Sequence, residues 1–281
     1  MEITAEDRAR FEVLPFEGIE EQAAQLPRPA RLTVTCSPAH GPDRGLEVAA
    51  RLCGSGHAVS VHVAARMVRD RAHLDALLAG MADACVDDLF LIGGDAERPL
   101  GAYGSAVDLL PVIAEHPRRP ARIGIAGYPE GHPSVADDDL EAALRRKSAL
   151  ADYVVTQMCF DPDALRRWVE RHRDLPVFVG MPGKVARRRL LKMSARIGVG
   201  PSIGFLRKQR GLRRLLSRRS TTDRLYDALA QLDVAGYQFF TFNELRETWD
   251  WWQEKGEETD RDTKQPSGAA RLVSGHGRAA A

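Results

Sequence analysis

The sequence predicts a single-domain α/β protein folded as a closed (β/α)8 TIM barrel. Eight short strand-like runs alternate with helix-like stretches along the chain, which is the order of a parallel α/β fold. Most of these runs are continuously apolar, as expected for parallel strands that are covered on both faces. A chain of 281 residues with 44% hydrophobic residues can also bury the core of one such barrel. A doubly wound open sheet is the alternative architecture.

The strand predictions rest on apolar runs that end in glycine, proline or a polar residue. They cover residues 10–16, 31–38, 58–64, 88–95, 123–127, 153–160, 177–183 and 237–243. In a (β/α)8 barrel the C-terminal ends of all the strands meet on one face, and that face carries the chemistry.

The helix predictions rest on apolar residues that recur at helical spacing between the strands. Leu165, Trp168, Val169 and His172, for example, follow the i, i+3, i+4, i+7 pattern of one helix face. The predicted helices cover residues 17–26, 46–53, 74–84, 106–115, 139–150, 165–172 and 245–252, with a long helical region between the last two strands. Residues 1–255 are therefore expected to form the barrel. Residues 256–281 lose this periodicity and are expected to be a disordered tail.

Composition excludes several classes of protein. The formal net charge of +1 gives no overall field that would attract nucleic acid or an anionic membrane. The four cysteines are scattered, without metal-ligand spacing, and are interpreted as reduced core thiols with no metal site. No uninterrupted apolar run approaches the ~18 residues of a membrane span, and the acidic N-terminus does not resemble a signal peptide. We therefore expect a cytoplasmic protein without a membrane partner; its oligomeric state cannot be read from the sequence.

Polar side chains capable of chemistry gather in the strands and at their ends. Glu12 lies between apolar neighbours in the first strand. It must either pair with another polar group or have a functional role, because burying an unpaired carboxylate is costly. His62 lies inside the third strand, as a core histidine or as a ligand contact. The strand ends add Asp95, Tyr128, Glu130, His132 and Gln157.

Several short segments together resemble the methylenetetrahydrofolate reductase family. The strongest are Ala126-Gly127-Tyr128-Pro129-Glu130-Gly131-His132-Pro133, Thr156-Gln157-Met158-Cys159-Phe160-Asp161 and Gly94-Asp95. Phe11-Glu12-Val13-Leu14-Pro15, Val34-Thr35 with Gly41, and Phe239-Phe240-Thr241-Phe242-Asn243 are similar to the family's first, second and last strands. These matches keep the family's order and span roughly residues 11–252.

This resemblance implies that the chain reduces 5,10-methylenetetrahydrofolate to 5-methyltetrahydrofolate with hydride from NADH or NADPH. Glu12 then occupies the position of the general acid, because apolar surroundings would raise its pKa and keep a proton available. Asp95 would act beside it in the catalytic site. Gln157 would bind the pterin ring of the substrate, and Phe205 falls close to a family phenylalanine that stacks on substrate or nicotinamide.

The family normally carries a bound flavin adenine dinucleotide (FAD), and here the resemblance is incomplete. The residues that match its cofactor-binding pattern are Thr35, His62, Gly94, Tyr128, His132, Arg146 and Lys147. Three others are replaced by smaller residues, namely Gly93, Ser105 and Ala143. Either FAD is retained, or reduced nicotinamide donates hydride directly to the substrate; the replacements favour the second.

Two further alternatives stay open. The basic stretch at residues 205–219 is either a solvated amphipathic helix or an anion site for a folate glutamate tail or cofactor phosphates. Nucleic acid is not expected as a partner, since aromatic residues are not interleaved with these charges. The barrel as a whole could also bind folate without turning it over, or act on a related one-carbon carrier.

Overall fold

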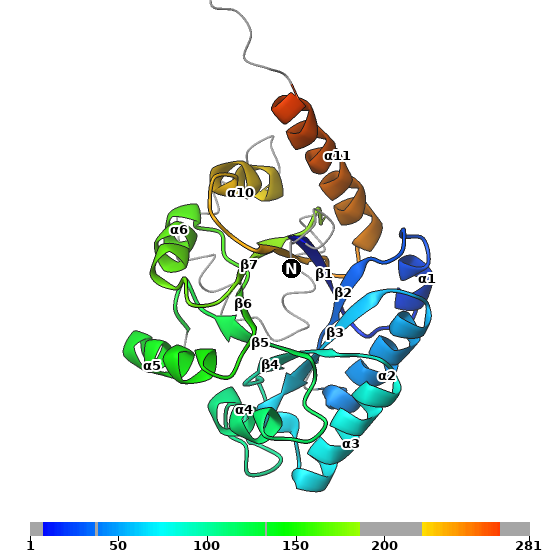
Figure 1. Cartoon of the computed structure of the whole chain (residues 1–281), viewed down its shortest axis with the longest axis vertical. Helices are drawn as coiled ribbons and strands as arrows, with labels where there is room; N and C mark the ends of the chain where they lie inside the picture. Colours follow the sequence, from blue (N-terminus) through cyan, green and yellow to red (C-terminus); the bar gives the residue numbers. More distant parts are fainter. Residues whose placement is uncertain (1–7, 37–38, 133, 186–220, 265–281) are drawn as a thin grey trace, which may run out of the picture.

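The chain forms a closed barrel of eight parallel strands in sequential order, in which the last strand pairs with the first. The computed structural model describes residues 8–36, 39–132, 134–185 and 221–264. Figure 1 shows the strands in the centre with the helices arranged around them. The predicted (β/α)8 fold is confirmed, because an open sheet would leave the first and last strands unpaired with each other.

The elements follow the predicted alternation of strands and helices. The strands are β1 Ala9–Val13, β2 Arg31–Val34, β3 Ala58–Ala64, β4 Asp88–Ile92, β5 Arg122–Gly127, β6 Tyr153–Thr156, β7 Val177–Pro182 and β8 Gly236–Phe240. The helices are α1 Ile19–Ala23, α2 Gly41–Gly54, the 3-10 turn η2 Ala65–Met67, α3 Arg71–Asp83, α4 Ala106–Ala114, α5 Asp137–Ser148, α6 Pro162–Arg171, α10 Thr221–Leu229 and α11 Leu245–Lys264.

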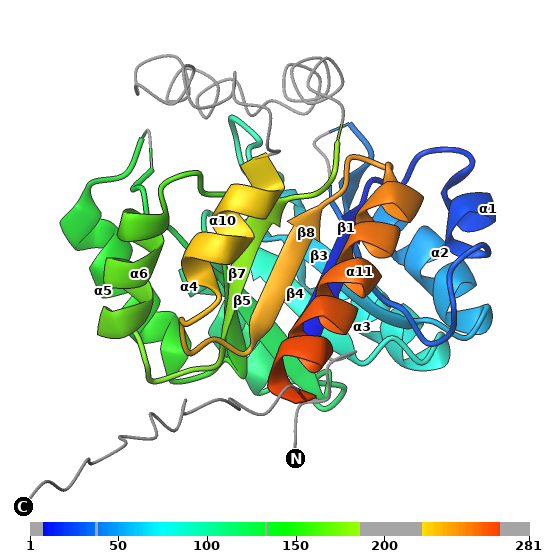
Figure 2. The same cartoon turned by 90° about the horizontal axis from the view of Figure 1, so that it is seen from above.

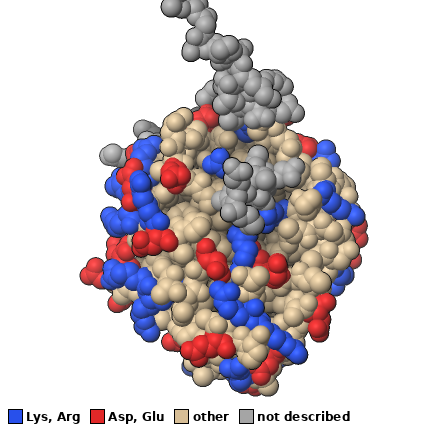
Figure 3. Space-filling view, in the orientation of Figure 1, with Lys and Arg blue, Asp and Glu red and all other residues tan. Residues whose placement is uncertain are grey.

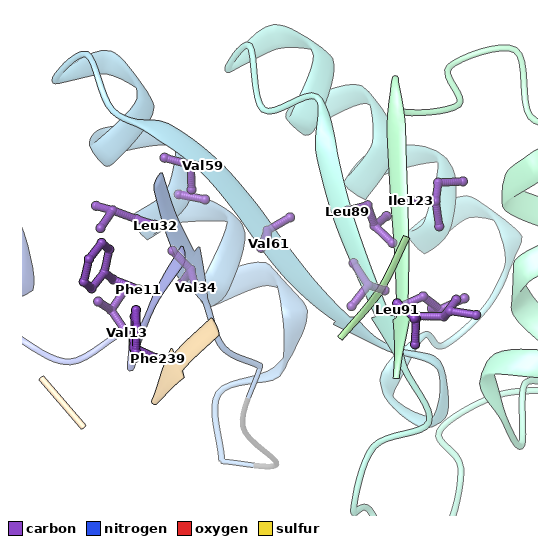
Figure 4. Packing of buried hydrophobic residues seen from close by; sticks show 14 of the residues in the cluster. Phe11, Val13, Leu32, Val34, Val59, Val61, Leu89, Leu91, Ile123 and Phe239 are labelled. Atoms are coloured by element: carbon purple, nitrogen blue, oxygen red, sulfur yellow. The ribbon is translucent and has the colours of Figure 1, made fainter. Parts of the chain in front are cut away.

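The main core lies between the strands and the surrounding helices. Successive residues of a strand point to opposite faces, so every second strand residue packs outward against a helix. The buried cluster includes Phe11, Leu32, Val61, Leu89 and Phe239, and Figure 4 shows these side chains on their strands. This layer explains why the strands read as apolar runs.

A second, smaller cluster fills the barrel itself. Phe90, Tyr153, Val155 and Phe178 come from β4, β6 and β7 and are buried together. The ring of Tyr153 lies against the backbone of Gly124 in the neighbouring strand, where an added Cβ would overlap the ring. Glycine at position 124 therefore lets a large aromatic side chain occupy the interior.

A buried ion pair lies beside this aromatic cluster, toward the N-terminal ends of the strands. The guanidinium group of Arg10 lies between the rings of Tyr153 and Phe178, 4.1 Å from each centroid, with Nη1 3.5 Å from Asp88 Oδ2. The hydroxyl of Tyr153 donates to Asp88 Oδ1 at 2.6 Å. We call these four residues the barrel floor, since Arg10 precedes Glu12 by two residues on the same face of β1.

Helix α11, which packs against β1, continues to Lys264, into the stretch expected to be disordered. Residues 265–281 lie outside the described part.

The prediction of core cysteines is wrong for Cys85, which is exposed at the end of α3. Among the described helices, none has the length and apolar character needed to cross a membrane.

Candidate active site

The strand-end residues meet on one face, as the barrel requires. Figure 2 views the barrel from the side, with the C-terminal ends of the strands toward the top of the picture. The loops after β4, β5 and β6 carry Asp95, Tyr128 with His132, and Gln157 respectively. Figure 3 shows the opposite face, at the N-terminal ends of the strands, where acidic and basic side chains are interspersed.

Glu12 lies inside the barrel on β1, with 13% of its side chain exposed. Its Oε2 accepts a hydrogen bond from Gln238 Nε2 of β8 at 3.1 Å. Burial raises the pKa of Glu12 from 4.5 to about 8, although the bond from Gln238 lowers it in part. The carboxyl group is therefore protonated at neutral pH and can donate a proton.

His62 faces Glu12 from β3, with its Nε2 3.9 Å from Glu12 Oε2. Burial lowers the pKa of His62 to about 3, and its ring packs against Phe90 with centroids 4.7 Å apart. At neutral pH a neutral imidazole thus faces a neutral carboxyl, so the pair is not a salt bridge. Nε2 of His62 is buried and has no hydrogen-bond partner among the described residues.

The raised pKa of Glu12 predicts that stability falls as pH rises. Between its unfolded pKa near 4.5 and its folded pKa near 8, the folded state holds a proton that the unfolded state has released. By pH 7 this difference in bound protons lowers the free energy of unfolding by roughly 3 kcal/mol. Glu12→Gln should remove the cost, so that its melting temperature relative to wild type rises between pH 5 and pH 7 in thermal denaturation. The same difference at both pH values would contradict the assignment.

Asp95, Tyr128 and His132 approach one another across the loops after β4 and β5. The rings of Tyr128 and His132 meet edge to face with centroids 5.3 Å apart. Burial raises the pKa of Tyr128, and the negative charge of the exposed Asp95 adds to that shift. Gly94 precedes Asp95 with φ of +89°, and an added Cβ would lie 2.8 Å from Cβ of Ala64. Glycine is thus required to bring the Asp95 loop against the end of β3.

Gln157 and Glu130 tie the loop after β5 to the loop after β6. Nε2 of Gln157 donates to the carbonyl oxygen of Gly131 at 3.0 Å. The Glu130 carboxyl group lies near the Cys159 thiol and the backbone of Phe160 and Asp161, and its interactions with these groups favour the charged form. Burial nevertheless raises the pKa of Glu130 above its ordinary value. Glu130 therefore holds two loops together, whereas Glu12 occupies the barrel.

Replacing Glu130 with Ala should destabilise the protein by ~1–3 kcal/mol, because the Cys159 thiol and the backbone of Phe160 and Asp161 lose the carboxyl group that interacts with them. The measurement is the free energy of unfolding from denaturant titration. Glu170→Ala is the matched control, since Glu170 is an exposed carboxylate on the adjacent α6 and should change stability by less than about 0.5 kcal/mol. Equal stability of the two variants would show that Glu130 does not join the loops.

The remaining matched residues differ in their exposure. Lys147 is buried and its Nζ donates to the carbonyl oxygen of Ala126 at 3.1 Å, while burial lowers its pKa to about 8. Arg146, the next residue of α5, is exposed. Thr35 is buried at the end of β2, and its Oγ1 has no partner among the described residues. Phe205 and the basic stretch at 205–219 lie outside the described residues.

Sequence reasoning missed Gln238 and the barrel floor. Gln238 is 1% exposed and contacts a residue 226 positions away, so no local pattern indicates the contact. One signal was present, because a single amide within the otherwise apolar Tyr237-Gln238-Phe239-Phe240 run falls on the interior face of its strand.

Comparisons with known proteins connect part of this site, the loops after β4, β5 and β6, with a family. Residues 57–182 match the family model described as methylenetetrahydrofolate reductase. Methylenetetrahydrofolate reductase 1 of Schizosaccharomyces pombe is 36% identical over 84 residues, which are 27% of this chain and 14% of that protein. Methylenetetrahydrofolate reductase 2 of Saccharomyces cerevisiae is 33% identical over 121 residues, which are 38% of this chain and 20% of that protein. The matches thus span a fifth or less of each relative.

Solved structures support the fold alone. Two crystal structures from Burkholderia cenocepacia J2315, one described as a lyase/mutase and the other as a phosphonomutase, superpose with a TM-score of 0.50 each. Their identities are 17% and 12%, over 92% and 93% of this chain and 84% and 94% of theirs.

The family match runs from the start of β3 to the end of β7 and includes the loops that carry Asp95, Tyr128, His132 and Gln157. From β3 to β7 the chain is therefore similar to the methylenetetrahydrofolate reductase family.

Proposed function

We propose that the protein reduces 5,10-methylenetetrahydrofolate to 5-methyltetrahydrofolate with hydride from a reduced nicotinamide nucleotide. The observation that carries this proposal is Glu12, a carboxyl group inside the barrel whose pKa is raised to about 8 by burial. A barrel that only bound folate would have no use for a protonated acid at this place.

The reaction needs one proton and one hydride. Protonation at N10 of the substrate breaks the bond from N10 to the bridging carbon, and the electron pair on N5 forms an iminium with that carbon. Hydride from the nicotinamide then adds to the same carbon and leaves a methyl group on N5. Glu12 supplies the proton, and its carboxylate takes up another from solvent before the next turnover.

Asp95 and Gln157 are assigned to the pterin ring in this proposal. A carboxylate accepts from N–H groups of the ring, while the amide of Gln157 keeps its oxygen and one N–H beyond its bond to Gly131. Tyr128 and His132 form an aromatic wall on the loop between them. Phe205 keeps its assignment as a stacking residue as a prediction from the sequence.

We further propose that hydride passes directly from nicotinamide to the substrate, without FAD. Gly93 has no side chain that could contact a flavin. A larger residue would fit at this position, because an added Cβ would meet no atom within 4 Å. Ser105 donates its hydroxyl to Asp108, and Lys147 directs its ammonium to a backbone carbonyl. These residues fit a flavin poorly, and two rings held in contact can exchange hydride without a carrier.

The test is to purify the protein, record its visible spectrum and assay it without added flavin. We expect no flavin absorbance and oxidation of NADH or NADPH that depends on methylenetetrahydrofolate, with one methyltetrahydrofolate formed per nucleotide oxidised. A flavin bound near stoichiometry, or an absolute need for added FAD, would overturn direct transfer. Binding of folate without nucleotide oxidation under either condition would overturn the reductase assignment. Comparing the two nucleotides in this assay also identifies the preferred donor.

A further inference from the structure

We propose that Gln238 is a positioning residue that fixes the Glu12 carboxyl group and determines which of its two oxygens carries the proton. This inference rests on the proposed role of Glu12 as the acid. Strand β8 lies against β1, with Gln238 opposite Arg10, which brings the amide beside Glu12. Its Nε2 donates to Glu12 Oε2 at 3.1 Å.

The direction of this hydrogen bond has a chemical consequence. An amide N–H can only donate, so Oε2 of Glu12 must present a lone pair to it. In a protonated carboxyl group the carbonyl oxygen is the better acceptor, which places the hydroxyl on Oε1. The bond also restrains rotation of the carboxyl group, so the acidic hydrogen keeps one direction inside the barrel.

No other described side chain competes for this role. His62 of β3 faces the same oxygen, but its Nε2 is 3.9 Å away, which is too long for a hydrogen bond. Arg10 and Asp88 compensate each other in the barrel floor, and the Tyr153 hydroxyl donates to Asp88. Gln238 is thus the one donor to the Glu12 carboxyl group in the part of the chain that the structure describes.

The bond also affects the acidity of Glu12. An amide donor binds an ionised carboxylate more strongly than a neutral carboxyl group, so Gln238 lowers the pKa that burial raises. Oε1 of Gln238 is buried without a partner among the described residues. If the amide were turned over, this oxygen would accept the acidic proton and raise the pKa instead. The sign of the change on removing Gln238 therefore distinguishes the two orientations.

The first experiment is the titration of Glu12 in wild type and Gln238→Met by infrared difference spectroscopy, with the Glu12 band assigned by its loss in Glu12→Gln. Methionine has a similar length and no N–H donor. We expect the midpoint to rise by about one pH unit in the variant. Gln238→Asn should shift it in the same direction, because its amide is one methylene too short, and it keeps the test available if the Met variant does not fold. Ser60→Ala is the matched control: it removes the buried Ser60–Thr33 hydrogen bond of 3.0 Å and should leave the midpoint unchanged.

The second experiment measures kcat and KM against pH with methylenetetrahydrofolate and reduced nicotinamide. In Gln238→Met the alkaline limb of kcat/KM should move to higher pH with the infrared midpoint, and kcat at the optimum should fall about tenfold with little change in KM. The proposal would be overturned if the infrared midpoint of Glu12 in Gln238→Met were unchanged or lowered. It would also be overturned if the variant lost activity while the alkaline limb of kcat/KM stayed at the same pH. If Gln238→Met raised the midpoint of Glu12 but the wild-type protein had no reductase activity, the role of Gln238 would be upheld. Only the proposed function would then be overturned.

Discussion

Glu12→Gln is expected to lower kcat for reduction of methylenetetrahydrofolate by about 10²–10⁴-fold, the usual contribution of a positioned general acid. The variant keeps the shape of the side chain and an oxygen that can accept from Gln238, but it has no acidic proton. Ring opening would then depend on protonation from water. The measurement is steady-state kinetics at several pH values. The fall in kcat at alkaline pH, which results from deprotonation of Glu12, should be absent from the residual activity of the variant.

Binding separates the proposed catalytic role of Glu12 from a structural one. The dissociation constant for 5-methyltetrahydrofolate, measured by calorimetry, should change by no more than a few-fold in Glu12→Gln. Glu17→Gln serves as a control, because Glu17 is an exposed carboxylate in the loop after β1 and should keep full activity. If folate binding collapsed in the Glu12 variant, Glu12 would be a recognition residue, and a different group would have to donate the proton.

The second large effect is expected on stability, from Asp88→Asn in the barrel floor. Burial raises the pKa of Asp88, while Arg10 and the Tyr153 hydroxyl favour its charged form. Asparagine would leave the Arg10 guanidinium buried between two rings without a counter-charge, and arginine cannot lose its proton there. Breaking one side of a buried pair costs about 3–5 kcal/mol, so the melting temperature should fall by roughly 10 °C.

A double variant checks the origin of that loss. Arg10→Met combined with Asp88→Asn removes the unpaired cation and should recover much of the stability lost in Asp88→Asn alone. Losses that simply add would indicate that Asp88 acts through its bond with Tyr153.

The fold could be predicted from the sequence because its signals are local. Each strand reads as an apolar run of a few residues, and each is followed by a stretch of helical periodicity, so the βα order is visible without knowledge of any contact. The match of short segments around Gly94, Tyr128 and Gln157 likewise needs only the residues themselves. These features placed the candidate site at the C-terminal strand ends before any geometry was available.

The directions and partners of the side chains could not be predicted, because they depend on residues far apart in the chain. Glu130 and Glu12 both read as acids beside apolar strands, yet the loop turns Glu130 toward Cys159. Arg146 and Lys147 read as one basic pair, yet adjacent helix positions lie about 100° apart, so only Lys147 is buried. The partner of Glu12 comes from the last strand.

The pairing of β8 with β1 has a consequence for the order of events during synthesis. The ribosome delivers the strand with Glu12 first and the strand with Gln238 last, and 226 positions separate the two residues. Until β8 docks, the edge of β1 stays open and the Glu12 carboxyl group lacks its amide donor. A nascent chain that already holds the loops of Asp95, Tyr128 and Gln157 would still have no oriented acid. The proposed reductase activity should therefore appear only once the ring of strands has closed.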